Sequence, residues 1–186
     1  MYLVAQKRRE YRKPTYVAYV DLKAAFDSVY RPSIWNLLRA IGIPDKIISL
    51  ITQLYSDTVS YVSVGGNLGE PFVTMSGVRQ GCILAPDLFD LCMDWVMERT
   101  VHRAMFGVSV GKESFTDLDF ADDVGLLSEL VDLLQSALVI LQEEGSPLGL
   151  QINWKKTKIQ SLCDYIPRPL DLVDLHLTLA RQKCRF

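Results

Sequence analysis

The spacing of apolar positions changes repeatedly along the chain and predicts alternating strands and helices. Residues 16–20 are rich in aromatic and β-branched side chains, which is typical of a buried strand. Apolar residues at helical spacing predict a long buried helix over 85–101 and another over 130–144. Further strands are expected at 59–64, 72–74, 108–110, 115–120, 124–127, 150–154 and 157–162. This order favours an α+β domain, with an antiparallel sheet and helices packed on one face.

Proline, glycine and helical periodicity define the remaining segments. A polar lead-in over residues 1–13 is expected to be helical, and Pro32 and Gly42 suit the start and the end of a following helix. Another helix is expected to begin at Asp45, with an apolar face formed by Ile47, Ile48, Ile51 and Leu54. No element is predicted for the tail after residue 164.

Composition places the chain among folded proteins of one domain. Nearly half of the 186 residues are apolar and about a quarter are charged, so a core can be buried. The formal net charge of −2 does not indicate a nucleic-acid binder. Basic residues nevertheless cluster on either side of a more acidic centre, at Lys7, Arg8, Arg9, Arg12, Lys13, Lys155, Lys156 and Lys158. Such a rim would suit an enzyme that holds a polyanion and a metal, although two solvated surface runs explain the charges equally simply.

The cysteines and the apolar runs exclude other classes of protein. The four cysteines are scattered and form no zinc-binding pattern with the two histidines, so a reduced intracellular protein is expected. No apolar run is long enough to predict a membrane span.

Two groups of carboxylates are candidates for chemistry. Asp122 and Asp123 lie between two apolar runs, where adjacent negative charges repel each other and a divalent cation would compensate. A simple turn is the competing interpretation.

Asp21 follows a buried strand, where a carboxylate is costly unless it is at the sheet edge, paired or metal-bound. Asp21 and Asp122 could serve a pair of metal ions if their strands are neighbours; Asp27 is interpreted as structural.

A glycine-flanked loop over residues 76–82 is the third candidate. Its glycines would let the backbone approach a ligand closely, and Gln80 could bond a base or a sugar. The loop lacks the Gly-Lys-Ser/Thr ending of a Walker phosphate-binding loop.

Together these segments resemble the conserved motifs of reverse transcriptases, in the order of that family. The sequence from Gly77 to Cys82 is similar to that of non-LTR retrotransposons rather than to that of group II introns. The resemblance covers about residues 10 to 163 and rests on four segments: Asp21–Asp27, Ser76–Phe89, Phe120–Asp123, and Gly149–Asn153 with Lys156–Lys158.

The resemblance implies the palm of an RNA-directed DNA polymerase. Asp21 and Asp122 would be the main ligands of Mg²⁺ or Mn²⁺, Asp123 would complete the acidic cluster, and the Leu22 carbonyl could add a ligand. The reaction would be attack of a primer 3′-hydroxyl on the α-phosphate of a deoxynucleotide, with RNA as template.

The resemblance also implies residues that hold the substrates. Phe26 would crowd the 2′ position of the sugar and so favour deoxynucleotides, unless it is a core phenylalanine. Phe120 would pack beside the primer end, and Lys156 is preferred over Lys155 and Lys158 as the lysine near pyrophosphate. The full set expected to contact nucleotide or template is Phe26, Gly77, Arg79, Gln80, Gly81 and Lys156.

The expected organisation is a basic lead-in over 1–14, a palm over 15–163 and an unassigned tail over 164–186. Fingers and thumb regions are not matched, so weak or no activity of the isolated chain and an exposed apolar surface are expected, with the missing segments supplied by a longer polyprotein. The family implies RNA template, DNA primer and deoxynucleotide as partners, no membrane, and a location in nucleus or cytoplasm. Alternatives are a non-catalytic relic or binding module that keeps the fold, and another metal-dependent enzyme such as a nucleotide cyclase.

Overall fold

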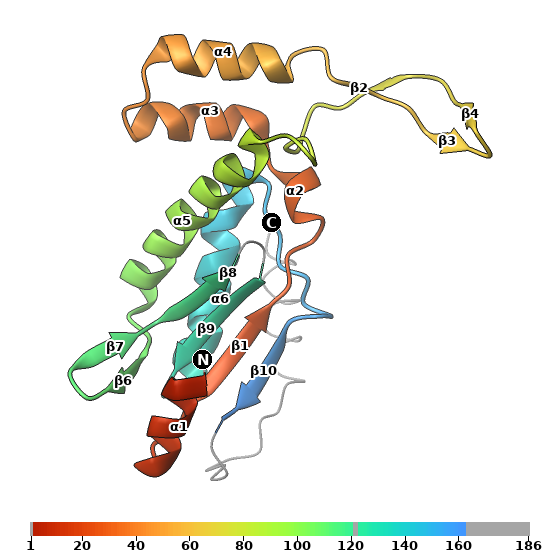
Figure 1. Ribbon diagram of the computed structural model, residues 1–186. Coiled ribbons are helices and arrows are strands. Elements are labelled where there is room, and N and C mark those ends of the chain that lie inside the picture. The colour runs from red at the N-terminus through yellow and green to blue at the C-terminus, as the bar shows by residue number, and fades with distance from the viewer. Residues whose placement is uncertain (1, 121–122, 163–186) are drawn as a thin grey trace, which may run out of the picture.

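The centre of the molecule is a four-stranded antiparallel sheet (Figure 1). The computed structural model describes residues 2–120 and 123–162. The strand order is β10-β1-β9-β8, with bounds Lys158–Ser161, Tyr16–Val20, Asp123–Ser128 and Asp117–Phe120. The antiparallel sheet is as predicted, and β1 and β9 are neighbours, which was the condition for bringing the predicted carboxylates together.

One face of the sheet packs on two long helices, α5 (Leu84–Ala104) and α6 (Val131–Gly145). Alternate residues of the central strands point into this core, because side chains along a strand alternate between its two faces. Ala18 and Leu126 are fully buried there, together with Phe89 of α5. The two predicted helices therefore have the predicted role of covering one face.

Among the described residues, the opposite face is covered near the start of β1. Val17 and Leu127 form a small second core with Val4 of α1 (Tyr2–Glu10) and Val108 of β6 (Val108–Val110). The β6 strand pairs with β7 (Glu113–Phe115) in a separate hairpin. Further along the same face Tyr19 is 42% exposed, so the described residues cover the face less fully toward Asp21.

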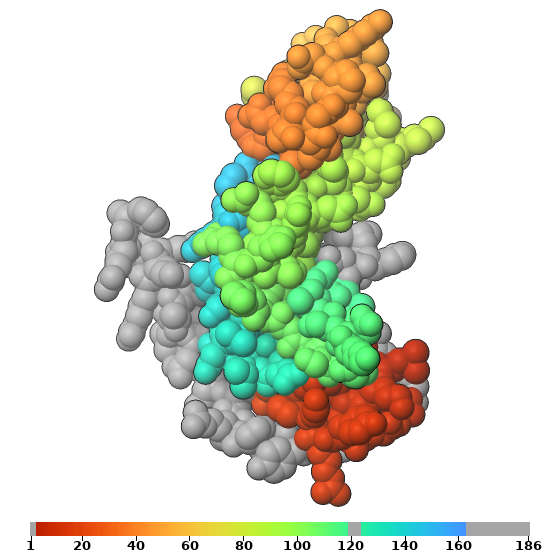
Figure 2. Space-filling view, turned by 90° about the vertical axis from the view of Figure 1, so that its left-hand side faces the viewer, coloured from red at the N-terminus to blue at the C-terminus, as the bar shows by residue number. Residues whose placement is uncertain are grey.

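Helices and a narrow ribbon extend from the other end of the sheet. The segment begins with α2 (Ala25–Ser28), α3 (Arg31–Ala40) and α4 (Asp45–Tyr55). Four two-residue strands follow: β2 (Val59–Ser60), β3 (Ser63–Val64), β4 (Asn67–Leu68) and β5 (Phe72–Val73). We call residues 45–75, which comprise α4 and the ribbon, the arm. We call the sheet together with α5 and α6 the body. Figure 2 shows α3 and α4 at one end of an elongated molecule and α1 at the other.

Three predicted elements differ from the structure. The strand expected over 59–64 is divided into β2 and β3, and the strand expected over 150–154 is a single bridge between Leu22 and Ile152. The apolar face of α4 is only partly buried: Ile48 is 1% exposed, but Ile47 and Leu54 are about half exposed. Periodicity identified this helix correctly but did not show that much of its apolar surface lacks a cover. The tail over 164–186 lies outside the described residues.

In the part of the chain that the structure describes, no helix combines the length and hydrophobicity needed to cross a membrane.

Candidate active site at the end of the central strand

Asp21 lies where β1 ends and beside the connection between β8 and β9. In the sheet Val20 is opposite Val124, and Phe120 is opposite Asp123. The backbone of residue 123 is therefore next to the end of β1. Asp122, predicted as a metal ligand, lies outside the described residues, and for Phe120 and Asp123 only the strands are described. The strand register thus places the end of β1, which leads to Asp21, next to the start of β9, the strand that begins at Asp123.

The carboxylate of Asp21 has one oxygen in use and one without a partner. Its Oδ1 is 3.7 Å from Nζ of Lys156. Its Oδ2 is shielded from solvent and accepts no hydrogen bond from the described residues. A buried carboxylate oxygen without a partner is costly, and a cation would remove that cost. The described residues alone contain no group of three acidic, histidine or cysteine side chains placed to hold a metal, so a complete cluster requires Asp122 and Asp123.

The segment after α6 holds the backbone of Asp21 in place. The Asp21 carbonyl accepts a hydrogen bond of 2.7 Å from the N–H of Asn153, and the Asp21 N–H donates to Oγ1 of Thr157 over 3.2 Å. The Lys23 N–H donates to the Gln151 carbonyl over 2.8 Å. Thr157 could not be assigned this role from the sequence, because a hydroxyl between two lysines carries no signal of what it contacts.

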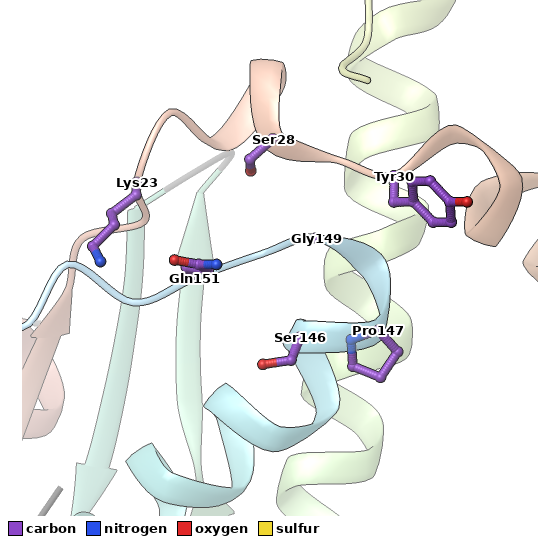
Figure 3. A pocket seen from close by; sticks show the side chains of 7 residues that line it. All are labelled: Lys23, Ser28, Tyr30, Ser146, Pro147, Gly149 and Gln151. Carbon is purple, nitrogen blue, oxygen red and sulfur yellow. The ribbon is translucent and has the colours of Figure 1, made fainter. Parts of the chain in front are cut away.

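Gly149 allows this segment to reach Asp21. Its φ is 84°, and an added Cβ would lie 2.3 Å from the Ser28 carbonyl oxygen and 2.9 Å from the Tyr30 nitrogen. Any side chain here would push the segment away from the connection between α2 and α3. On the outer side of this contact is a shallow hollow of about 500 Å³, lined by Lys23, Ser28, Tyr30, Ser146, Pro147, Gly149 and Gln151 (Figure 3).

The glycine-flanked loop is fastened to α2. The N–H groups of Gly77 and Val78 donate to the carbonyls of Val29 and Phe26 over 2.7 and 2.8 Å. An added Cβ on Gly77 would lie 2.8 Å from the Cα of Asp27. The expectation that both glycines admit a ligand needs correction at Gly77, which is buried and gives space to the protein's own backbone.

The exposed part of the loop carries the side chains that were expected to contact nucleotide or template. Arg79, Gln80 and Gly81 are exposed. Space is open where a Gly81 side chain would be, so close approach of a ligand stays a prediction there. Nε2 of Gln80 is 3.4 Å from Oδ1 of Asp27, and the Asp27 carbonyl accepts a hydrogen bond from Ser76. These contacts support the structural interpretation of Asp27.

Phe26 is half-buried and stacks on Phe89 of α5. The ring centroids are 4.6 Å apart and the planes are inclined by 17°. The ring therefore packs against the main core while part of it stays accessible. This position accommodates both predicted roles, a core contact on one side and a steric contact with substrate on the other.

The structure distinguishes among the three candidate lysines. Lys156 pairs with Asp21, and its side chain is 70% exposed. Lys158 lies in β10, in register with Tyr19. Within the described residues, Lys156 is thus the lysine that the fold brings to the candidate carboxylate.

This architecture is that of a polymerase palm, with an antiparallel sheet, helices on one face and an acidic residue where the central strand ends. A telomerase from Candida tropicalis has the same fold, with a TM-score of 0.62 and 15% identity over 90% of this chain and 35% of that one. The chain belongs to the reverse transcriptase (RNA-dependent DNA polymerase) family, whose profile matches residues 3–186.

Its relatives confirm the predicted resemblance to non-LTR retrotransposons. A Retrovirus-related Pol polyprotein from the type-1 retrotransposable element R2 of Popillia japonica is 32% identical over 81% of this chain. The R2 polyprotein of Nasonia vitripennis is 36% identical over 77% of it. The chain spans 21% and 14% of the lengths of these two relatives.

Proposed function

We propose that this domain performs RNA-templated DNA synthesis, in which a primer 3′-hydroxyl attacks the α-phosphate of a deoxynucleotide and pyrophosphate leaves. The observation that carries the proposal is the carboxylate of Asp21 at the end of β1. Asp21 lies there beside the β8–β9 connection, and its shielded Oδ2 has no partner among the described residues. This is the donor that a divalent cation requires.

Asp21, Asp122 and Asp123 would hold Mg²⁺ or Mn²⁺. The Leu22 carbonyl is a further oxygen ligand in this proposal, since it accepts no hydrogen bond from the described residues. When bound, a pair of such ions activates the attacking hydroxyl and stabilises the leaving phosphate. The bonds from Asn153 and Thr157 keep the Asp21 backbone in one position, so the carboxylate is oriented before substrate arrives.

Lys156 would supply positive charge to the departing pyrophosphate. Its exposed ammonium is beside Asp21, so one side chain can balance the carboxylate in the free protein and turn to the phosphates when nucleotide binds. Phe26 would exclude a 2′-hydroxyl by clash, and Phe120 would contact the primer end. Arg79 and Gln80 would bind template or incoming nucleotide.

We further propose that RNA template, DNA primer and deoxynucleotide are the partners, and that long products need other segments of a longer polyprotein. The chain spans 21% or less of the R2 relatives described above. The isolated chain is therefore expected to add one or a few nucleotides rather than to copy a long template.

Incorporation of one deoxynucleotide on a primed RNA template, with Mg²⁺ or Mn²⁺, tests the proposal. Asp21→Asn keeps the size of the side chain and removes its charge, and should lower kcat at least about a hundredfold. Asp122→Asn should do the same. Asp132→Asn, an exposed aspartate in the first turn of α6, is the matched control and should leave kcat unchanged. Incorporation that survives Asp21→Asn would refute the assigned carboxylate, and no incorporation by the folded wild-type chain would favour the non-catalytic alternative.

A further inference from the structure

Arg31, the first residue of α3, is a buried arginine that joins three separate segments. It is 8% exposed. Its Nε donates to the Gly77 carbonyl over 2.8 Å, and its Nη1 donates to the carbonyls of Thr74 and Tyr55 over 2.8 and 3.2 Å. These acceptors belong to the Ser76–Gly81 loop, the end of the ribbon and the end of α4. A buried guanidinium is tolerated only when its donors are used, so Arg31 fixes the three segments relative to one another.

Tyr55, the last residue of α4, lies between two arginines. It is 4% exposed. The guanidinium carbons of Arg31 and Arg79 are 5.3 and 5.7 Å from the centroid of its ring, within the range of cation–π attraction. Nη2 of Arg79 also donates to Oγ1 of Thr58 over 3.0 Å. The exposed side chain of Arg79 is thereby held by an aromatic ring and a hydroxyl.

The two arginines leave positive charge uncompensated at this point. Among the described residues neither Arg31 nor Arg79 forms an ion pair with a carboxylate. Burial lowers the pKa of Arg31, and the charge of Arg79 lowers it further. Unpaired cations at a surface attract an anion, and the phosphates of template or nucleotide are the anions of the proposed reaction.

The Tyr55 side chain contacts the loop through Arg79, and its hydroxyl is a buried polar group. This hydroxyl has no well-formed hydrogen bond to the described residues. Burial raises the pKa of Tyr55, while the backbone N–H of Arg79 acts in the opposite direction and the Cys82 thiol adds to the rise. The contact between the Tyr55 ring and the Arg79 guanidinium therefore joins the end of α4 to the loop.

We propose that Arg31 and Tyr55 are positioning residues, which hold the Ser76–Gly81 loop against α3 and the end of α4 and aim the Arg79 guanidinium at a substrate phosphate. The second half of this assignment rests on the proposed function; the first half does not. Neither residue touches the reacting atoms, so their effect on synthesis would act through substrate binding.

Hydrogen exchange of the free chain tests the positioning without any reaction. In Arg31→Gln and in Tyr55→Leu, the amides of residues 76–82 should exchange at least about tenfold faster, which corresponds to about 1.4 kcal/mol, while β1 and β9 stay protected. Tyr55→Phe keeps the ring and should behave as wild type. Arg8→Gln is the matched control, because Arg8 is also buried, at 1% exposure, but donates to Ser109 and Thr15 at the other end of the sheet.

The kinetic test uses single-nucleotide incorporation. Arg31→Gln and Tyr55→Leu should raise KM for the primed template about tenfold and change kcat much less, while Tyr55→Phe should retain the wild-type KM. Unchanged exchange in both the Arg31→Gln and Tyr55→Leu chains would overturn the positioning role, as would loop exchange that rises equally in Arg8→Gln. Faster loop exchange with an unchanged KM would overturn the aiming of Arg79 alone. If the wild-type chain incorporates nothing, the proposed function fails, but hydrogen exchange still decides whether these residues hold the loop. If Arg31→Gln does not fold, Tyr55→Leu still allows the hydrogen-exchange test.

Discussion

The body and the arm both contain many apolar residues but bury them differently. In the body, residues such as Ala18, Leu126 and Phe89 are fully buried because the sheet and the helix layer face each other. In the arm most large apolar side chains are exposed: Ile47, Leu50, Leu54, Val59, Tyr61, Val62, Val64, Leu68, Phe72, Val73 and Met75. Apolar side chains become a core only where a second element covers them. The difference shows that hydrophobic patterning alone does not identify a core.

The ribbon of the arm is also nearly uncharged. Between Thr58 and Met75 the only charged residue is Glu70, so this ribbon offers no cation to a phosphate backbone. Charged contacts with nucleic acid are instead expected at Arg79, in the loop that precedes α5, and at Lys156, just before β10. The body thus carries the proposed chemistry, and the arm bears on it through Arg31, which bonds the ends of α4 and the ribbon to the loop.

Two phenylalanines give the largest expected contrast. Phe89 is fully buried and stacks on Phe26, so Phe89→Ala should lower the free energy of unfolding by about 3–5 kcal/mol through lost contacts and a cavity. Phe72 in the arm is 49% exposed, and Phe72→Ala should cost under about 1 kcal/mol. Urea denaturation of both variants measures the difference. Comparable losses would mean that the ribbon is packed in solution and that the contrast between arm and body is wrong.

Two glycines with almost the same φ separate strain from crowding. Gly149 and Gly66 have φ of 84° and 83°, but an added Cβ meets the Ser28 carbonyl oxygen at 2.3 Å in the first case and open space in the second. Gly66→Ala should therefore cost only the left-handed strain, about 1 kcal/mol. Gly149→Ala should cost about 3 kcal/mol, because backbone has to move as well.

The same pair has a functional consequence. Displacing Gly149 would draw Asn153 away from Asp21 and Gln151 away from Lys23. Gly149→Ala should therefore also reduce incorporation, whereas Gly66→Ala should not. Thermal unfolding and incorporation, measured on both variants, check this. A Gly149→Ala chain that is as stable as the Gly66→Ala chain would show that the contact with α2 is loose.

Sequence reasoning predicted the elements of the body well, because periods of two and of 3.6 residues reflect burial on one side. It placed Asp21 at the end of a strand, but its meeting with the second acidic segment depended on β1 and β9 being neighbours, which the pattern of one strand does not determine. Thr157, Arg31 and Tyr55 were missed for another reason. Their partners are mostly backbone groups distant in sequence, and any residue can supply a backbone carbonyl.

Ion pairs give the smallest contrast and one that depends on pH. Glu144 of α6 pairs with Arg99 and Arg103 of α5, and its side chain is 12% exposed. Its hydrogen bond with Arg99 lowers the pKa of Glu144 below its ordinary value of 4.5, burial opposes the shift, and Arg103 strengthens it. A depressed folded pKa means that the ionised form stabilises the fold above the unfolded value, and that this stability is lost as the pH falls through the folded pKa.

Glu144→Gln should therefore lower the free energy of unfolding at pH 7. The loss should be only about 1 kcal/mol, because both arginines are partly exposed and solvent screens the ion pairs. The difference from wild type should shrink as the pH falls below 4.5 and the wild-type carboxylate becomes protonated. The control in the arm is Asp45→Asn, which removes a pair with Arg39 of 3.4 Å whose side chains are 88% and 55% exposed; it should cost under about 0.5 kcal/mol at any pH. Urea denaturation at several pH values measures both. A Glu144→Gln difference that stays constant into strong acid would show that the pair acts through shape and not through charge, and the electrostatic link between α5 and α6 would have to be abandoned.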